Sequence, residues 1–197
     1  MFKRTFIFAA ALFGMLAFTP LPVAAQDEAE DLTEETSEAT AKKSKKKAKK
    51  PVSPVVTAVK KIKKVKGRVN EKCDYYIFLF SASWCGPCCK EMPEIVETYN
   101  KEIKKSGKVD IILFCQDKTP AAAKAFVNNF KIKFMTVMGS DDKCAKVPGY
   151  APASGIPHCM IVDRYGRKIT AGHPASILPS WEALTIEKGE PEAPETK

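Results

Sequence analysis

The run Tyr75-Tyr76-Ile77-Phe78-Leu79-Phe80 is apolar throughout, and three residues later the chain reads Trp84-Cys85-Gly86-Pro87-Cys88. A continuous apolar run of this length predicts a central strand that is buried on both faces. Two cysteines with two residues between them, the first at the start of a helix, form a dithiol that can close to a disulfide and reopen. The sequence therefore predicts a redox-active pair where a buried strand gives way to a helix.

The two cysteines are expected to play different roles. A helix N-terminus presents N–H groups without intrahelical partners and the positive end of the helix dipole, and both favour thiolate over thiol. Such sites lower a cysteine pKa from about 8.5 to roughly 3.5–7.5. Cys85 comes first, at the exposed turn, so we expect it to be the nucleophile. Cys88 lies one helical turn further in, so we expect it to be the resolving thiol.

A second motif, Gly155-Ile156-Pro157-His158, precedes the strand-like stretch Cys159-Met160-Ile161-Val162-Asp163. Together the two motifs resemble the thioredoxin superfamily, and most closely its exported TlpA/ResA-like branch, over about residues 75–184. The resemblance implies an α/β, thioredoxin-like fold with a central mixed β-sheet flanked by helices on both faces. It also implies a cis peptide bond before Pro157, facing the dithiol, and a backbone at Ile156 that binds the substrate peptide.

The segment after the first motif also matches this branch, whose pattern is C-x-x-C-x-x-E-x-P. Glu91 stands at the glutamate that the branch uses to manage protons near the thiols, although a solvated residue favoured by the helix dipole is an equal alternative. Pro93 stands at the family's kink-forming proline. Leu79 departs from ordinary thioredoxins, which carry a buried aspartate there. The resemblance thus implies these site residues: Cys85, Cys88, Pro157 and Glu91 for catalysis, and Trp84, Gly86, Pro87 and Ile156 for substrate binding.

The function implied is that of an exported thiol–disulfide oxidoreductase. The Gly86-Pro87 pair between the cysteines is typical of reducing members, and the branch acts on apocytochrome c or other oxidised thiols. We therefore expect reduction of protein or small-molecule disulfides, with electrons from a membrane donor. No cofactor beyond the Cys85–Cys88 disulfide is expected.

A Cu(I)-binding metallochaperone of the same fold is the alternative. Thiolates suit Cu(I), Cys85 and Cys89 have the C-x-x-x-C spacing of Sco-type copper chaperones, and His158 follows the key proline. Against it, His158 points into a predicted strand, and His173, the other histidine, lies in a predicted loop. No metal ligand is assigned, and zinc is disfavoured because no second ligand pair has finger-like spacing.

The chain ends predict export. Residues 1–25 read as a signal peptide with Lys3 and Arg4, an apolar run shorter than the roughly 20 residues of a membrane span, and cleavage near Ala25; an uncleaved anchor is the alternative. Residues 26–54 read as a disordered linker with seven acids and then seven lysines. Residues 55–187 form the thioredoxin-like domain and residues 188–197 a flexible acidic tail. A periplasmic or otherwise exported location follows.

The net charge of +9 is concentrated outside the catalytic body. Residues 60–68 alone carry +6. Contact with an anionic membrane or wall surface is one interpretation of these Lys-rich segments, and a solvated spacer is the other. Nucleic acid is not expected as a partner of an exported protein.

Periodicity and turn signals predict the remaining elements. We expect helices over residues 55–66, 85–105, 120–130, 141–147 and 175–184, and strands over residues 75–81, 109–114, 134–137, 158–162 and 168–171. The other cysteines are expected to be mostly structural. Cys115 and Cys159 lie on core strands, a disulfide between Cys73 and Cys144 is conceivable, and Cys89 is a bystander packed behind the site.

Overall fold

The computed structural model describes residues 51–186 and 191–193. The expected signal peptide, the linker up to residue 50 and most of the expected tail lie outside these residues. Within the described ranges, no helix is long and apolar enough to cross a membrane. The described residues include Ser53, which the linker prediction covers but which is fully buried. It caps the helix α1, Pro54–Val59, and donates its hydroxyl to the Arg164 carbonyl oxygen at 2.5 Å.

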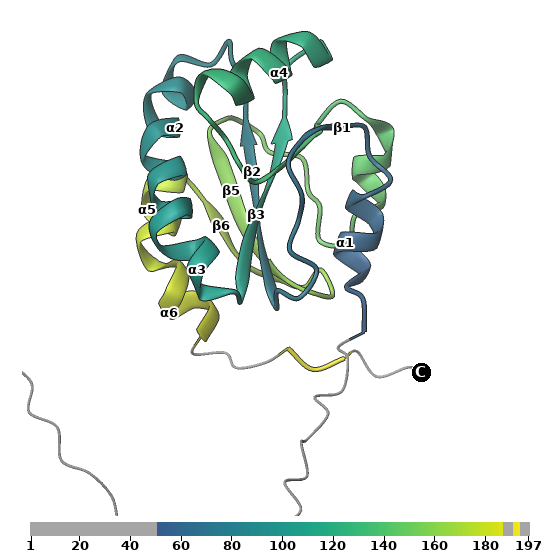
Figure 1. Ribbon diagram of the computed structural model, residues 1–197. Coiled ribbons are helices and arrows are strands. Elements are labelled where there is room, and N and C mark those ends of the chain that lie inside the picture. The colour runs from purple at the N-terminus through teal and green to yellow at the C-terminus, as the bar shows by residue number, and fades with distance from the viewer. Residues whose placement is uncertain (1–50, 187–190, 194–197) are drawn as a thin grey trace, which may run out of the picture. The chain divides into compact units, whose positions relative to one another are not determined.

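The sheet has six strands in the order β1-β4-β3-β2-β5-β6 (Figure 1). Strands β2, β3 and β4 run parallel to one another, while β1, β5 and β6 pair antiparallel with their neighbours. The expected mixed sheet is therefore confirmed. The strands are β1 Lys64–Lys66, β2 Tyr75–Ser81, β3 Val109–Cys115, β4 Met135–Met138, β5 His158–Asp163 and β6 Lys168–Gly172.

Helices cover both faces of this sheet, as expected (Figure 1). Successive strand residues point to opposite faces. The odd-numbered residues of β2 from Tyr75 to Leu79 pack into a core with α2, α4 and α6, while the even-numbered residues from Tyr76 to Phe80 pack into a second core with α1 and η2. The helical segments are α1 Pro54–Val59, α2 Gly86–Thr98, η1 Tyr99–Ile103, α3 Lys104–Ser106, α4 Pro120–Asn129, η2 Asp142–Lys146, α5 Pro174–Ile177, η3 Leu178–Ser180 and α6 Trp181–Ile186.

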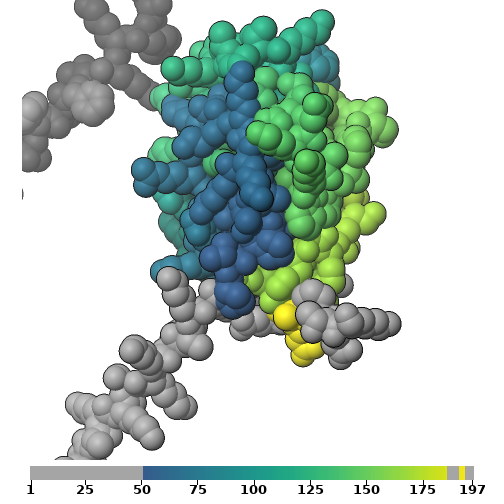
Figure 2. Space-filling model, turned by 90° about the vertical axis from the view of Figure 1, so that its right-hand side faces the viewer, coloured from purple at the N-terminus to yellow at the C-terminus, as the bar shows by residue number. Residues whose placement is uncertain are grey.

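The helix predicted over residues 55–66 is wrong in its second half. Helix α1 ends at Val59, and Lys64–Lys66 is instead the edge strand β1, paired with β4. Long-range hydrogen bonds override the local pattern here: the Lys63 carbonyl oxygen accepts from the Met138 amide, and the Lys63 amide donates to Asp141. Figure 2 shows the face on which residues 51–70 lie beside the region of η2.

Two further helices differ in detail from the prediction. The helix expected over residues 85–105 is present as consecutive α2, η1 and α3, with Pro93 inside α2 and a π-helical turn at Tyr99–Ile103. The helix expected over residues 175–184 is divided into α5, η3 and α6, because Pro179 occupies the middle of η3. Proline lacks the N–H that a continuous helix would need there.

Candidate active site

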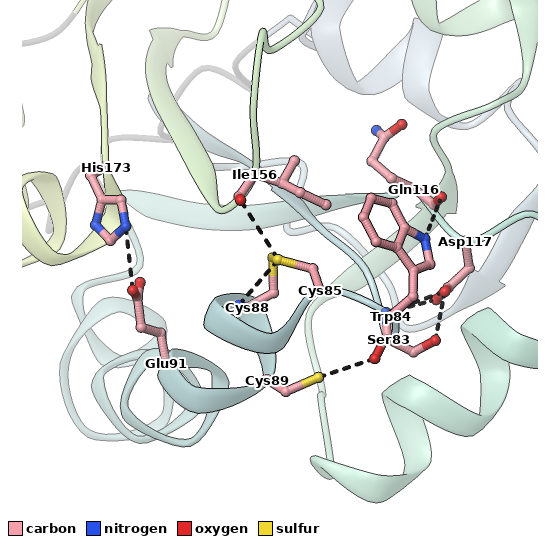
Figure 3. Close-up of a disulfide and its surroundings, with 10 residues drawn as sticks. All are labelled: Ser83, Trp84, Cys85, Cys88, Cys89, Glu91, Gln116, Asp117, Ile156 and His173. Atoms are coloured by element: carbon pink, nitrogen blue, oxygen red, sulfur yellow. Dashed lines mark hydrogen bonds and ion pairs between the residues drawn. A yellow bond between two sulfur atoms is a disulfide. The ribbon is translucent and has the colours of Figure 1, made fainter.

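Cys85 is the N-cap of α2, and its sulfur accepts a hydrogen bond from the Cys88 amide at 3.3 Å (Figure 3). The two cysteines form a disulfide with their Cα atoms 5.2 Å apart. Gly86 and Pro87 between them are both exposed, and the proline stands in the first turn, where a missing N–H costs nothing. This geometry places a sulfur at the helix terminus where backbone N–H groups stabilise negative charge.

The expected cis peptide bond joins Ile156 to Pro157. The Ile156 carbonyl oxygen lies 3.6 Å from the Cys85 sulfur (Figure 3), and the Ile156 side chain packs against the cluster of Ala82, Cys85 and Cys88. The two motifs that are about 70 residues apart in the chain therefore meet at one sulfur atom. The Ile156 carbonyl oxygen and the disulfide are therefore direct neighbours.

Trp84 stands beside the disulfide with 65% of its surface exposed, and its Nε1–H donates to the Gln116 carbonyl oxygen at 3.3 Å. It borders a recess of about 510 Å³ that reaches Cys85. The recess also holds the aromatic side chains of Phe80 and Tyr150 and the segment 152–156. Cys85 thus borders a largely apolar surface hollow.

Asp117 is a site residue that the sequence analysis missed. It is buried and accepts hydrogen bonds from the Ser83 hydroxyl at 2.6 Å, from the Ser83 amide at 3.2 Å and from the Cys115 thiol at 3.1 Å. Together with the Trp84–Gln116 bond, it ties the loop before Cys85 to the end of β3. One signal was available for its place, though not for its partners, because Asp117 lies two residues after the buried strand β3, and the carboxyl ends of parallel strands meet at one edge of a sheet.

Glu91 and His173 face each other across the site, with 3.3 Å between Oε1 and Nε2 (Figure 3). His173, which the sequence analysis placed in a loop, is the N-cap of α5, and its Nδ1 accepts from the Ala175 amide at 3.3 Å. The second carboxylate oxygen of Glu91, Oε2, is buried and has no hydrogen-bond partner among the described residues. Of the two alternatives for Glu91, the solvated helix residue is not what the structure shows, because the side chain is half-buried and has a specific partner.

Four cysteines, here called the core cysteines, are free and buried: Cys73, Cys115, Cys144 and Cys159. The conceivable Cys73–Cys144 disulfide is thus wrong; these thiols donate instead to the carbonyl oxygens of Gly107 and Met138. Burial raises the pKa of Cys73, Cys115 and Cys159 to about 12 and that of Cys144 to about 11. The packing expected for Cys115 and Cys159 is confirmed.

Cys89 and His158 bear on the copper alternative. The Cys89 thiol donates to the Ser83 carbonyl oxygen at 3.2 Å. The His158 ring packs 6.0 Å from that of Phe80, and burial together with the neighbouring His173 lowers its pKa. Within the described part of the chain, no three or more His, Cys, Asp or Glu side chains are grouped so as to hold a metal ion. The copper alternative gains no support from these residues.

Comparison with known proteins agrees with this geometry. A model of the Redoxin family matches residues 63–177, which is more than half of the chain. A thiol–disulfide oxidoreductase ResA from Bacillus thuringiensis (strain Al Hakam) is 37% identical over 94 residues, covering 47% of this chain and 51% of that protein. A nucleoredoxin from Xenopus laevis is 33% identical over 106 residues, covering 53% and 25%. The chain thus spans about half the length, or less, of these curated relatives.

Among solved structures, a mutant of tryparedoxin-I superposes with a TM-score of 0.53 at 20% sequence identity. The superposition covers 67% of this chain and 96% of that one. At this identity the likeness establishes the thioredoxin-like fold and nothing about substrates.

Proposed function

This chain belongs to the Redoxin family, and on that premise we propose that it reduces disulfides through the Cys85–Cys88 pair. One observation carries the proposal. The Cys85 sulfur accepts a backbone N–H at the start of α2, faces the Ile156 carbonyl oxygen beside a cis proline, and borders an open apolar recess. A sulfur in this setting is stabilised as a thiolate and is accessible to a second sulfur.

The proposed reaction starts from the reduced pair. The Cys85 thiolate attacks one sulfur of a substrate disulfide, the substrate S–S bond breaks, and the released sulfur takes up a proton. Cys88 then attacks the Cys85 sulfur of the mixed disulfide, its proton leaves, and the second substrate sulfur is released as a thiol. Two electrons have passed from the Cys85–Cys88 dithiol to the substrate, and the pair is left as the disulfide.

We propose that the substrate is a protein or peptide rather than a small disulfide. The recess beside Cys85 is large enough for a side chain next to the substrate cysteine, and its lining by Phe80, Trp84 and Tyr150 favours an aromatic or aliphatic one. Reduced apocytochrome c is a product that would fit the branch the chain resembles. A membrane dithiol donor that returns the pair to the reduced state is part of the same proposal.

The test of direction is the equilibrium potential of the Cys85–Cys88 pair, combined with the rate of insulin disulfide reduction with dithiothreitol as donor. A potential near that of thioredoxin, about −270 mV, together with turnover supports the reductase. A value near −120 mV, that of a strong oxidant, would reverse the direction of electron flow. A chain that never forms the disulfide would overturn the proposal altogether.

Export remains part of the proposal and rests on residues 1–25, which lie outside the described ranges. N-terminal sequencing of protein recovered outside the cytoplasm should begin near Gln26. Recovery of a chain that begins at Met1 would favour the uncleaved anchor. Fractionation with a cytoplasmic marker would contradict export itself.

Contact with an anionic surface is the least specific part of the proposal. Lys64, Lys66 and Arg68 are exposed at the edge strand β1, and they line a groove of about 800 Å³ together with Lys104 and Lys133. Binding to vesicles that contain anionic lipid should weaken as salt rises. Equal binding to neutral vesicles would contradict an electrostatic contact.

A further inference from the structure

The contact between Glu91 and His173 has a defined direction. Because His173 Nδ1 accepts the Ala175 amide, the uncharged imidazole must carry its proton on Nε2. That nitrogen faces Glu91 Oε1. The cap of α5 therefore fixes which nitrogen of His173 donates to the carboxylate.

The two oxygens of Glu91 are consequently unequal. Oε1 receives the donor from His173, whereas Oε2 is buried without a hydrogen-bond partner among the described residues. A buried acceptor in this state calls for an explanation, because burial removes water and nothing replaces it. A role for Oε2 as a proton acceptor during the reaction is such an explanation.

Glu91 and the resolving cysteine, Cys88, lie on the same helix. Glu91 lies three residues after Cys88 on α2, so the two side chains share one face of the helix. Its charge also reaches the sheet beneath the disulfide, since it adds to the effect of burial in raising the pKa of Cys159. Cys159 is in register with Leu79 on β2, the strand that leads into the redox motif. The charge of Glu91 thus reaches a part of the sheet at which Leu79 carries no proton acceptor.

We infer that His173 is a positioning residue that holds Glu91 so that Oε2 accepts the proton of Cys88 during resolution. The inference rests on the proposed function. In this step the Cys88 thiol gives its proton to Glu91, and its sulfur attacks the Cys85 sulfur of the mixed disulfide. The Cys85–Cys88 bond forms as the bond to the substrate sulfur breaks. The substrate sulfur leaves with that electron pair and takes a proton from solvent, and Glu91 later releases its own proton to solvent.

The charges around Glu91 explain why a donor is needed. Glu94 on the same helix and Glu102 on η1 line a recess of about 260 Å³ together with Glu91. A hydrogen-bond donor stabilises the charged form of a carboxylate among such neighbours. His173 supplies that donor, and His158 on β5 is the other titratable group near it, since burial and His173 lower the His158 pKa. Loss of the His173 donor should therefore move the pH dependence of resolution to higher pH.

Two substitutions separate the contact with Glu91 from the cap of α5. His173→Asn keeps an acceptor for the Ala175 amide, because asparagine is a good N-cap, but it is too short to reach Glu91. His173→Gln keeps a donor at the distance of Nε2 and weakens the cap. The experiment follows a single turnover: the reduced protein reacts with an aryl disulfide, and the second release of coloured thiolate reports attack by Cys88 at each pH.

Glu91→Gln should slow the second release by about a hundredfold, the lower end of the range for general acid–base catalysis. His173→Asn should slow it by about tenfold and shift its pH profile upward, while His173→Gln stays within about twofold of the parent protein despite a lower thermal midpoint. In the Glu91→Gln background, His173→Asn should add nothing, because the two residues act as a unit.

The inference is overturned if His173→Asn keeps the parent pH profile, or if its effect is the same with and without Glu91. Failure of the proposed function looks different, because the parent protein itself would then form no mixed disulfide or would not release the second thiolate. Melting curves of all variants show whether each protein is folded at the pH of the assay.

Discussion

The Cys85–Cys88 pair and the four core cysteines share one residue type and similar burial, yet their sulfurs face opposite partners. Cys85 and Cys88 are 7% and 1% exposed, which is close to the values of the core cysteines. The Cys85 sulfur accepts from a backbone N–H, whereas Cys73, Cys115 and Cys144 donate their protons to oxygen atoms. We therefore expect the reactivity of each cysteine to follow its hydrogen-bond partner, a backbone donor at Cys85 and an oxygen acceptor at these three core cysteines, rather than its exposure.

The backbone makes this difference. Helix α2 begins directly after Cys85, so the Cys88 N–H in its first turn donates to the Cys85 sulfur. Cys115 and Cys159 lie on strands, where the N–H groups are consumed by the sheet and the side chain meets apolar neighbours. An amide donor favours the charged sulfur, and an apolar or acceptor-rich site favours the neutral thiol.

The largest effect expected from this comparison is on turnover. Cys85→Ser should reduce insulin reduction by at least about a thousandfold, because a serine hydroxyl cannot form the mixed disulfide. Cys159→Ala, the matched control from the core, should keep turnover within about threefold while lowering the free energy of unfolding by about 1–2 kcal/mol. Equal losses in both variants would erase the distinction between the two sets.

Labelling of the reduced protein should separate the sets almost as sharply. At pH 7 a thiol with a pKa of about 12 is ionised in only about one molecule in 10⁵. Iodoacetamide should therefore modify Cys85 first and the partly exposed Cys89 next, with the four core cysteines unmodified until the protein unfolds. Peptide mass spectrometry of a time course gives the order, and early labelling of Cys115 or Cys159 would contradict it.

Stability at alkaline pH tests the core cysteines as a group. Their pKa values are raised in the folded protein, so their contribution is complete below the unfolded value of 9.0 and is lost as pH rises towards 11–12. The free energy of unfolding should fall by several kcal/mol over that window, since one unit of pKa difference corresponds to about 1.4 kcal/mol.

Urea midpoints at pH 7, 9 and 10.5 measure this loss. The buried tyrosines Tyr76 and Tyr99, whose pKa values burial also raises, contribute with the same sign. Cys115→Ala should therefore flatten the curve only in part. A midpoint that does not change across the window would show that the core thiols are hydrated and not as the structure places them.

Elements that depend on neighbours in the sequence were predictable. The apolar run from Tyr75 to Phe80 is β2, and the Thr119-Pro120 start signal is the cap of α4, where the Thr119 hydroxyl accepts from the Ala122 amide. In both cases, burial or capping comes from residues within one element. The cis bond before Pro157 was expected from family resemblance and is present.

Features that depend on partners far along the chain were not predictable. Residues 64–66 continue a helical pattern locally, but their backbone pairs with β4, some 70 residues away. The roles of Asp117 and His173 arise from contacts with Ser83 and Glu91, across 34 residues and more. No periodicity records such pairings, because each is a single side-chain contact made by tertiary packing.

An intermediate effect is expected at Asp117, which contacts both a core cysteine and the redox loop. It accepts hydrogen bonds from the Cys115 thiol and from Ser83 in the loop before Cys85. Asp117→Ala should lower the free energy of unfolding by about 1–3 kcal/mol, because the buried Cys115 thiol and the two donors of Ser83 lose their acceptor. Turnover should fall by about tenfold through the loosened loop. Urea unfolding and insulin reduction measure both, and Asp117→Asn, which retains one acceptor oxygen, should lie in between.

The smallest effect is expected at Cys89, which adjoins the redox pair in sequence and resembles the core cysteines in its contacts. It lies about 100° around α2 from Cys88, and its thiol donates to the Ser83 carbonyl oxygen, an oxygen partner like those in the core. Serine can make the same bond, so Cys89→Ser should leave kcat/KM within about twofold of the parent protein. Cys89→Ala, which loses the bond but no redox group, is the matched control. A tenfold loss in Cys89→Ser with full activity in Cys89→Ala would fit neither a bystander nor a reacting Cys89. A tenfold loss in both variants would place a third sulfur in the reaction, and Cys89 would then belong with the redox pair rather than with the core cysteines.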